Sequence, residues 1–240
     1  MTGPRAALTL DLDWAPDFMI DDAAQALIER GVRATWFVTH ASPAVERLRE
    51  RPDLFELGLH PNFLAGSSHG ATPEEVVAHC AALVPGARAV RTHCLMQSTP
   101  LHDALLAGSD VEVDVSLFLP GATHVEAVEQ WSPGGRLMRL PYVWQDNMEM
   151  YAPRAQWSVD ELLDPPGLRI FDFHPVHVWL NSASFDPYER LKATRPLGEV
   201  APEDAAAFRN DGGPGARTAF LALADRLAEL GGGFKVSDLA

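Results

Sequence analysis

Short apolar runs alternate with amphipathic segments along the whole chain. The runs that predict β-strands cover residues 6–10, 34–39, 55–59, 87–91, 111–117, 137–142, 168–173 and 234–236. The segments that predict α-helices cover residues 21–31, 45–50, 73–83, 101–107 and 216–230. Strands that alternate with helices are typical of a parallel sheet or barrel, so we expect an α/β fold.

Three stretches between these elements are expected to be loops. They cover residues 62–70, 148–153 and 185–215, and the third is long enough to be a lid, an oligomer contact or plain surface. The chain contains no internal repeat, block of like charge or linker. We therefore expect residues 1–240 to form one domain, and the pattern leaves the oligomeric state open.

Composition narrows the class of protein. The 240 residues are 47% hydrophobic and 22% charged, which is the balance of an ordinary globular protein. The only two cysteines, Cys80 and Cys94, exclude a disulfide scaffold and a cysteine-built zinc finger. A net charge of −14 argues against a general nucleic-acid binder and against binding to anionic membranes.

The sequence also bears on where the protein works. No stretch approaches the ~20 consecutive apolar residues of a membrane span. Residues 1–8 are too short and too weakly apolar to be a signal peptide, and they run directly into the first strand pattern. We therefore expect a cytoplasmic protein without a membrane-spanning segment.

Acids and histidines follow most of the predicted strands. Parallel α/β folds gather active-site groups at the carboxyl ends of their strands, so side chains that follow different strands are expected to converge. The residues in these positions are Asp11, Asp13, Trp14, Asp17, His40, His60, Asn62, His69, Arg91, His93, Asp114, His174 and His177.

The first strand ends in two carboxylates on one face. Asp11 and Asp13 are two positions apart, so their side chains lean to the same side of the strand. Such a pair is costly unless a cation or a shared proton relieves the repulsion. A divalent metal held by one acid and several histidines is the plainest relief, and it leaves the other acid free to act as a base. The alternative is that both acids cap the next helix or bind backbone amides of a loop.

The histidines and the arginine also have structural alternatives. His60 is as compatible with a buried core histidine as with a ligand, and His69 lies in a Ser-Ser-His-Gly turn, where a solvated role fits equally well. Arg91 is also compatible with pairing to a structural acid. The pair His174 and His177 follows a strongly apolar strand, which favours a role in the site.

The order of these motifs resembles the polysaccharide deacetylases, the carbohydrate esterases that share the NodB homology domain. No single motif is specific, but the series runs in the same order over nearly the whole chain. The matching segments are Leu8–Asp13, Gly31–Val38, Glu56–His60, Arg91–His93, Ile170–His174 and the closing Leu227–Leu239.

This resemblance implies a fold, a cofactor and a set of roles. The fold would be a distorted, incomplete (β/α) barrel, and the reaction would hydrolyse an acetyl amide or ester on a sugar. The cofactor would be a divalent metal, commonly zinc, held by one aspartate and two histidines. On that pattern Asp11 is the general base and Asp13 and His60 bind the metal. Arg91 orients the base, and His174 is the general acid.

Some metal-site positions depart from the family pattern. Leu12 separates two acids that are usually adjacent, and Leu64 stands where the second histidine ligand is expected. His69 and Asn62 are the candidates to replace that ligand. We favour His69, because imidazole is a far better zinc ligand than a carboxamide.

Other positions suggest contacts with the substrate. His93 stands where the family has a proline, so it is an additional site group, and His177 competes with His174 for the role of acid. Trp14 and Tyr142 are expected to stack on a sugar ring, because aromatic faces suit the apolar side of a pyranose. Trp14, His93, Tyr142 and His177 form the expected substrate-binding set.

The sequence therefore predicts a metal-dependent hydrolase that removes an acyl group, acetyl first of all, from an N-acetylated sugar or a sugar-containing intermediate. A cytoplasmic location would favour a sugar nucleotide or a lipid-linked sugar over a wall polymer. Two alternatives remain, namely hydrolysis of a non-sugar amide of the formamide or ureide type and a degenerate barrel that binds sugar without catalysis. The missing histidine at position 64 favours the second alternative.

Overall fold

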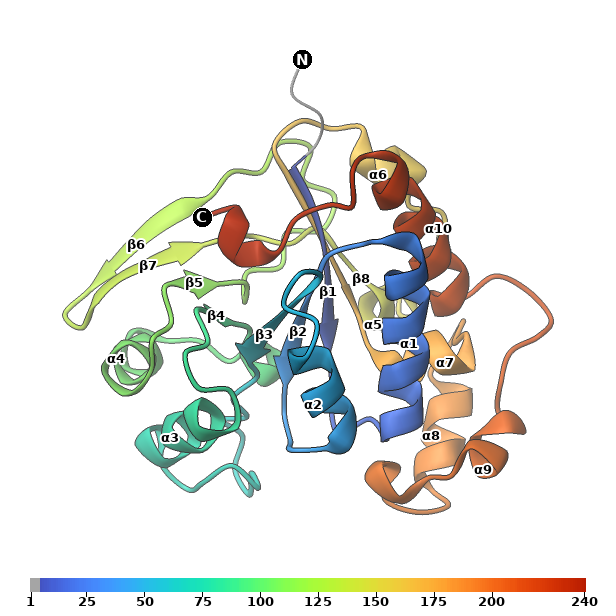
Figure 1. The fold of residues 1–240 in the computed structure, drawn as a ribbon, viewed down its shortest axis with the longest axis horizontal. Coiled ribbons are helices and arrows are strands. Elements are labelled where there is room, and N and C mark those ends of the chain that lie inside the picture. Colours follow the sequence, from blue (N-terminus) through green and yellow to red (C-terminus); the bar gives the residue numbers. More distant parts are fainter. Residues whose placement is uncertain (1–4) are drawn as a thin grey trace.

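Nine strands within residues 5–240 build one sheet, which curls into an incomplete barrel (Figure 1). The structure is a computed structural model that describes residues 5–240. Residues 1–4, part of the segment in which we expect no signal peptide, lie outside the described residues. The strands are β1 (Arg5–Asp11), β2 (Ala34–Val38), β3 (Phe55–Leu59), β4 (Ala89–Val90), β5 (Val113–Asp114), β6 (Val128–Ser132), β7 (Gly135–Arg139), β8 (Trp144–Gln145) and β9 (Leu168–Phe173).

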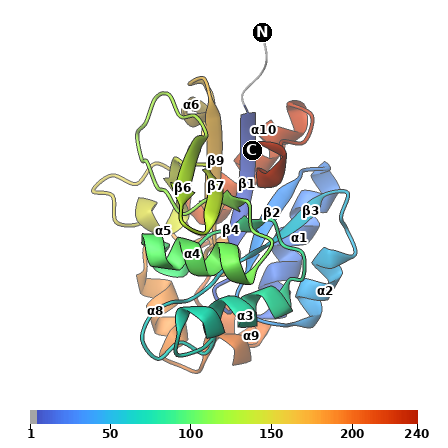
Figure 2. The same cartoon turned by 90° about the vertical axis from the view of Figure 1, so that its left-hand side faces the viewer.

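The strand order is β6-β7-β5-β4-β3-β2-β1-β9-β8. Every neighbouring pair is parallel except β6–β7, which forms an antiparallel ribbon beside α4 in Figure 2. The two arms of the sheet approach each other where Phe118, beyond β5, forms a parallel bridge with Tyr142, before β8. This curled sheet confirms the expected α/β fold with a distorted, incomplete (β/α) barrel.

Helices pack around the outside of the curled sheet (Figure 1). They are α1 (Asp17–Arg30), α2 (Pro43–Arg49), α3 (Pro73–Leu83), α4 (Thr99–Gly108), α5 (Asp146–Glu149), α6 (Asp160–Leu163), α7 (Pro175–Leu180), α8 (Asp186–Lys192), α9 (Pro202–Ala206) and α10 (Ala216–Glu229). Local signals explain their ends. Thr72 and Glu75 form a capping box at the start of α3, and Gly31 ends α1 in the left-handed conformation.

The central strands alternate between an apolar outer side and a polar inner side. Phe173 of β9 packs edge-to-face on Phe220 of α10, with ring centroids 5.3 Å apart. The preceding residue, Asp172, contacts Thr9 of β1 instead, on the inner side. Because successive side chains of a strand point to opposite faces, this alternation carries polar groups into the barrel while the outer core stays apolar.

Several element predictions differ from the structure, and the short elements β8, α5, α6 and α7 were not expected. Helix α1 begins at Asp17 rather than residue 21, directly after Pro16, and strand β6 was not expected. The predicted loop 185–215 contains α8 and α9. The predicted strand 234–236 is wrong: Phe234 donates one backbone hydrogen bond to Ala6, and the chain then forms a 3-10 turn at Val236–Asp238. The triplet 234–236 forms no strand because β1, the strand it contacts, is already paired on both sides, with β2 and β9.

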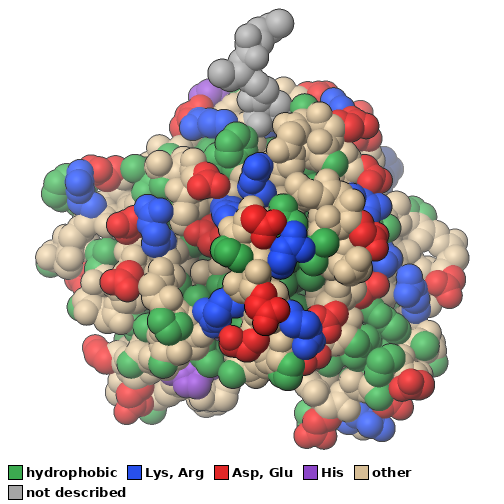
Figure 3. Space-filling model, viewed as in Figure 1, with side chains coloured by type: hydrophobic (Ala, Val, Ile, Leu, Met, Phe, Trp, Pro, Cys, Tyr) green, Lys and Arg blue, Asp and Glu red, His purple; other side chains and the backbone are tan. Residues whose placement is uncertain are grey.

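The distribution of charge and the hydrophobicity of the helices bear on the function. Acidic and basic side chains are interspersed over the face shown in Figure 3. Within residues 5–240, no helix combines the length and the hydrophobicity needed to cross a bilayer.

Candidate metal centre and catalytic residues

Three potential metal ligands meet at the carboxyl ends of β1, β3 and β4. Asp13, His60 and His93 each follow one of these strands. The Oδ1 atom of Asp13 lies 3.1 Å from Nε2 of His60 and 3.0 Å from Nδ1 of His93, and the two ring nitrogens are 3.4 Å apart. Three donor atoms this close to one another form one face of a potential coordination shell.

The orientation of His60 suits metal binding. The ring is buried, and its Nδ1–H donates a hydrogen bond to the carbonyl oxygen of Arg91 at 2.7 Å. In the neutral ring this bond places the lone pair on Nε2, the nitrogen that faces Asp13 and His93. Burial alone would lower the pKa of His60, but without an ion the negative charges of Asp11 and Asp13 outweigh burial and raise the pKa, so Nε2 then donates to Asp13 instead. A backbone carbonyl that fixes the tautomer of a ligating histidine is a common feature of metal sites.

Asp13 is held as an anion. Its backbone is in the left-handed region, with φ of 43°, which turns the chain sharply after β1. Burial alone would raise the pKa of the carboxyl. Hydrogen bonds from His60 and His93, together with the charges of His60 and His174, outweigh burial and hold the pKa well below its usual range. An ionised carboxylate beside two imidazoles is a donor set that suits zinc.

His69, the expected third ligand, lies elsewhere. Its Nε2–H donates to the carbonyl of Thr39 at 2.8 Å, and its Nδ1 accepts from the backbone N–H of Asn62 at 3.2 Å. Both ring nitrogens are therefore engaged within the protein. The amide oxygen of Asn62 accepts from the backbone of Leu64 at 3.0 Å. The structure thus brings His93, and neither His69 nor Asn62, next to Asp13 and His60.

Asp11 lies beside this group and is paired with Arg91. Its Oδ1 accepts from Nη1 of Arg91 at 2.9 Å, and its Oδ2 faces Nε2 of His60 at 3.6 Å. The guanidinium is fully buried and stacks between the rings of Phe37 and Tyr142, at 4.6 and 4.5 Å. Arg91 therefore fixes one oxygen of Asp11 and leaves the other toward the potential metal ligands.

His174 approaches the same group from the end of β9. Its Nε2 lies 3.6 Å from Oδ2 of Asp13, and its Nδ1 lies 2.7 Å from Oδ1 of Asp146. Burial alone would lower the pKa of His174. The charge of Asp146 and the hydrogen bond to it outweigh burial and raise the pKa well above its usual value. These contacts with Asp146 favour the protonated imidazolium, which is the state that a general acid requires.

His177 has the opposite electrostatic character. Burial lowers its pKa to about 4, and its Nδ1 lies 3.1 Å from Oγ of Ser182. Its ring contacts Phe185 and Tyr188, with centroids 5.8 and 4.9 Å apart. A neutral histidine in this position is a poor proton donor and a suitable wall for a substrate.

The two aromatic candidates occupy different surroundings. Trp14 is half-buried and stands edge-on to His93, with ring centroids 5.4 Å apart. Tyr142 is completely buried, with its ring over Arg91 and its hydroxyl donating to Gln145 at 3.1 Å. Trp14 therefore lies where a ligand can reach it, whereas Tyr142 supports the site from behind.

Two buried acids of the site were missed by sequence analysis. Asp146 follows β8, a strand of two residues that the hydropathy pattern does not reveal. Asp172 lies inside β9 and contacts Nη1 of Arg91 at 2.5 Å. Burial, together with the nearby charge of Asp11, raises the pKa of Asp172 well above its usual range, although Arg91 opposes this effect. An acid within an otherwise apolar strand was the available signal for Asp172.

A second group of acids and histidine does not look like a metal site. Donor atoms of Asp11, Asp172 and His174 lie within 4.8 Å of one another. The guanidinium of Arg91 already supplies a positive charge there, because Nη1 binds both aspartates. A divalent cation in the same place would be repelled by Arg91 and by protonated His174.

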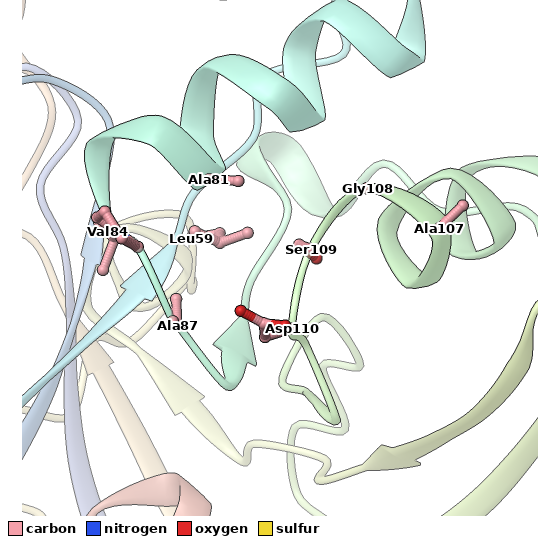
Figure 4. Close-up of a pocket in the computed structure, with 10 residues that line it drawn as sticks. Leu59, Ala81, Val84, Ala87, Ala107, Gly108, Ser109 and Asp110 are labelled. Atoms are coloured by element: carbon pink, nitrogen blue, oxygen red, sulfur yellow. The ribbon is translucent and has the colours of Figure 1, made fainter.

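A cavity of about 410 Å³ lies between α3, α4 and the strands β3 to β5 (Figure 4). Its lining includes Ala87, which precedes β4, and Asp110, which precedes β5. The acids and histidines of the candidate site follow their strands, and none of them lines this cavity. Apart from Ser109 and Asp110, the residues around this cavity are small or apolar, such as Val84 and Ala107, and no cluster of catalytic groups lines it.

The family model of WbmS-like polysaccharide deacetylases matches residues 8–192. The chain belongs to this family. A solved relative of this WbmS-like deacetylase is WbmS from Bordetella bronchiseptica, which is assigned as a polysaccharide deacetylase involved in O-antigen biosynthesis. The two chains are 33% identical and superpose with a TM-score of 0.81, over 92% of this chain and 90% of the other. The predicted resemblance to polysaccharide deacetylases, and the NodB-type barrel, are thereby confirmed.

Other comparisons add little. The 4-α-glucanotransferase of Thermococcus litoralis aligns with a TM-score of 0.48 and 12% identity, over 84% of this chain and 38% of the other, which is too distant to bear on the WbmS-like deacetylase. No curated protein matches the chain at a significant level. Membership in the family supports a hydrolytic deacetylase that acts on sugar.

Proposed function

We propose that this WbmS-like deacetylase is a metal-dependent hydrolase that removes an acetyl group from the amide nitrogen of a sugar. One observation carries the proposal. The potential metal ligands Asp13, His60 and His93 have a candidate base, Asp11, on one side and a candidate acid, His174, on the other. Asp11 lies 3.6 Å from His60, and His174 lies 3.6 Å from Asp13. One is a carboxylate paired with arginine, and the other is a histidine held protonated by an acid.

We propose that Asp13, His60 and His93 hold the divalent ion, with zinc as the first choice. Two imidazoles and one carboxylate are a donor set typical of catalytic zinc. Such an ion polarises an acyl carbonyl and lowers the pKa of a bound water molecule to about 7. His93 supplies the third metal-binding nitrogen or oxygen, which Leu64 cannot supply. This favours an enzyme over a degenerate sugar-binding barrel.

The two proton-transfer roles follow from the surroundings of each residue. Asp11 accepts a proton from the attacking water through Oδ2, because Oδ1 is already bound to Arg91. His174 donates a proton to the amine that leaves the acyl carbon, and Asp146 holds the imidazolium in place. His177 stays neutral and takes no proton-transfer role.

The position of His174 indicates where the sugar lies. The amine that receives its proton stays on the sugar, so the sugar extends toward the ends of β8 and β9. Aromatic rings lead outward on that side: His177 contacts Phe185, and Phe185 packs at a tilt against Tyr151 with ring centroids 4.7 Å apart. Tyr151 is 71% exposed, which leaves its ring available to a saccharide.

A hollow of about 400 Å³ lies next to this aromatic path. It is lined in part by Phe118, which follows β5, by Gln145 of β8 and by Met148 of α5. Gln145 immediately precedes Asp146, the partner of His174. We propose that this hollow and Tyr151 receive the part of the substrate beyond the acetylated sugar.

The relative in Bordetella suggests the biological class of substrate. That protein is involved in O-antigen biosynthesis. We propose that this chain likewise acts on a sugar destined for a surface polysaccharide. If the protein is cytoplasmic, as its sequence suggests, the substrate is an assembly precursor such as a sugar nucleotide or a lipid-linked sugar.

The test is release of acetate by purified protein from a panel of N-acetylated sugars, sugar nucleotides and oligosaccharides. Zinc-loaded protein should release acetate, a chelator should abolish the release, and added zinc should restore it. Asp11→Asn is the matched inactive control, because it keeps the size of the base and removes its charge. Absence of acetate across the whole panel from zinc-loaded protein would contradict the proposal, and formate as product would favour the formamide alternative.

A further inference from the structure

Asp172 is buried at the centre of the barrel and has no part in the roles described above. Its Oδ1 accepts from Nη1 of Arg91 at 2.5 Å and lies 3.2 Å from the hydroxyl of Thr9. Its Oδ2 is buried and has no hydrogen-bond partner within residues 5–240. A buried carboxyl with one unsatisfied oxygen is costly to folding, so its presence calls for a function.

The guanidinium of Arg91 is used in an unusual way. Its Nη1 donates to both Asp11 and Asp172, and its Nε donates to the carbonyl of Val115 at 3.1 Å. Its Nη2 is buried and makes no hydrogen bond to any described residue. One nitrogen therefore serves two acids while the neighbouring nitrogen serves none.

This arrangement departs from the pairing that arginine and a carboxylate favour. A guanidinium binds a carboxylate most strongly through two parallel hydrogen bonds, one to each oxygen. Arg91 binds only Oδ1 of Asp11, and Oδ2 remains directed toward His60, 3.6 Å away. A two-pronged pair would occupy the oxygen that faces the potential metal ligands.

We propose that Asp172 is a positioning residue, which holds Nη1 of Arg91 between the two acids and so prevents Arg91 from binding both oxygens of Asp11. The inference rests on the proposed role of Asp11 as base. Oδ1 of Asp172 accepts a hydrogen bond whether or not the carboxyl is protonated, so its position is what matters. The consequence is a base with one oxygen anchored and one oxygen free.

The decisive variant is Asp172→Leu, with Asp172→Asn as the conservative partner. Leucine removes the acceptor and lets Arg91 turn onto Asp11, so kcat should fall about 10- to 100-fold, as it does when a catalytic group is displaced. KM and zinc affinity should stay within about twofold of the wild-type values. This is a small change, because a factor of ten corresponds to about 1.36 kcal/mol. Asparagine keeps an acceptor oxygen, so kcat should stay within about threefold on the same scale.

Stability separates positioning from a structural role. Removing one partner of a buried ion pair usually destabilises a protein, because the other charge is left unpaired. In Asp172→Leu, however, Arg91 keeps Asp11 as its counter-ion, and the buried Oδ2 that has no hydrogen-bond partner among residues 5–240 is removed. The melting temperature of Asp172→Leu should therefore equal or exceed that of the wild type while kcat falls. Thr9→Val is the packing control, because it alters a neighbour of Asp172 that does not touch Arg91, and its kcat should not change.

The position of the Arg91 side chain can be measured without any enzyme activity, so it tests the inference independently of the proposed function. Crystal structures of the zinc-loaded wild type and of Asp172→Leu should show Nη2 of Arg91 apart from Asp11 in the first and bound to Oδ2 of Asp11 in the second. These results stand even if no substrate is deacetylated. The inference is overturned if Nη2 already binds Asp11 in the wild type, if Asp172→Leu retains full kcat, or if Asp172→Asn loses as much kcat as Asp172→Leu.

Discussion

Asp146 accepts two hydrogen bonds from His174, one from the ring Nδ1 at 2.7 Å and one from the backbone N–H at 2.8 Å. The two bonds fix both the position of the residue and the direction of its imidazole. They leave Nε2 facing the donor group around Asp13. The charge of Asp146 also raises the pKa of His174, so this one contact sets both geometry and protonation state.

Asp146→Asn should weaken the general acid. The variant keeps a hydrogen-bond acceptor but loses the charge that stabilises the imidazolium, so the pKa of His174 should fall. Because the acid acts only when protonated, the alkaline limb of the kcat profile should move to lower pH. At neutral pH kcat should drop by about 10²-fold, the low end of the range for losing acid catalysis. An unchanged alkaline limb would exclude His174 as the acid.

Replacing His93 by alanine should remove tight zinc binding. A direct ligand should matter more than an outer partner, whose loss costs about 10- to 100-fold in metal affinity. The matched control is His69→Ala, which removes the bonds to Thr39 and Asn62 but touches neither Asp13 nor His60. It should lower the melting temperature and leave zinc affinity unchanged. Isothermal titration of both variants with zinc checks this, and the opposite pattern would restore His69 as the ligand.

Tyr151→Ala should impair binding of long substrates selectively. If Tyr151 stacks on a saccharide beyond the acetylated sugar, its removal should raise KM about 2- to 10-fold for oligosaccharides, taking 0.5–1.5 kcal/mol for an aromatic contact. KM for a single sugar should not change. Trp131→Ala is the control, since Trp131 is 69% exposed and lies on β6, away from the site residues. Equal KM changes in the two variants would contradict a subsite at Tyr151.

Stability should depend on pH through His177. Its pKa is lowered by burial to about 4 from an ordinary value of 6.5. Between these values the unfolded chain binds a proton that the folded chain does not, so stability falls as pH falls. His177→Gln should lessen that loss by up to about 3 kcal/mol, at 1.36 kcal/mol per pKa unit. Urea unfolding of both proteins at pH 7 and pH 4.5 measures the difference, and parallel losses would contradict it.

The fold and part of the site could be predicted because the relevant signals are local. Apolar runs end at Asp11, Leu59 and Phe173, and each is followed by residues that the structure brings together at one end of the barrel. The alternation of Asp11 and Asp13 places their carboxylates near the same histidine, His60. Strand ends and the period-two alternation of side chains can both be recognised from the pattern of apolar and polar residues in the sequence.

The parts that escaped prediction depend on loop geometry and on very short strands. His69 looked like the better ligand because imidazole suits zinc, but the loop folds its ring against Thr39. His93 comes close instead because the chain after β4 turns sharply, with Cys94 in the left-handed region at φ of 54°. Asp146 follows a strand of two residues, too short to produce a hydropathy pattern. The conformation of the backbone in these segments cannot be inferred from the types of residue they contain.

The parallel pairing of β1 with β9 has a consequence for how the protein folds. Leu8 lies opposite Phe171 in the register, so β1 finds this neighbour only after residues 12–167 have been synthesised. Contacts so distant in sequence form slowly, and an unpaired strand edge invites association with other chains in the meantime. A nascent chain that stops before β9 would have neither the proposed acid, His174, nor a closed centre, so activity and protection from aggregation should arrive together, once β9 and His174 have been synthesised.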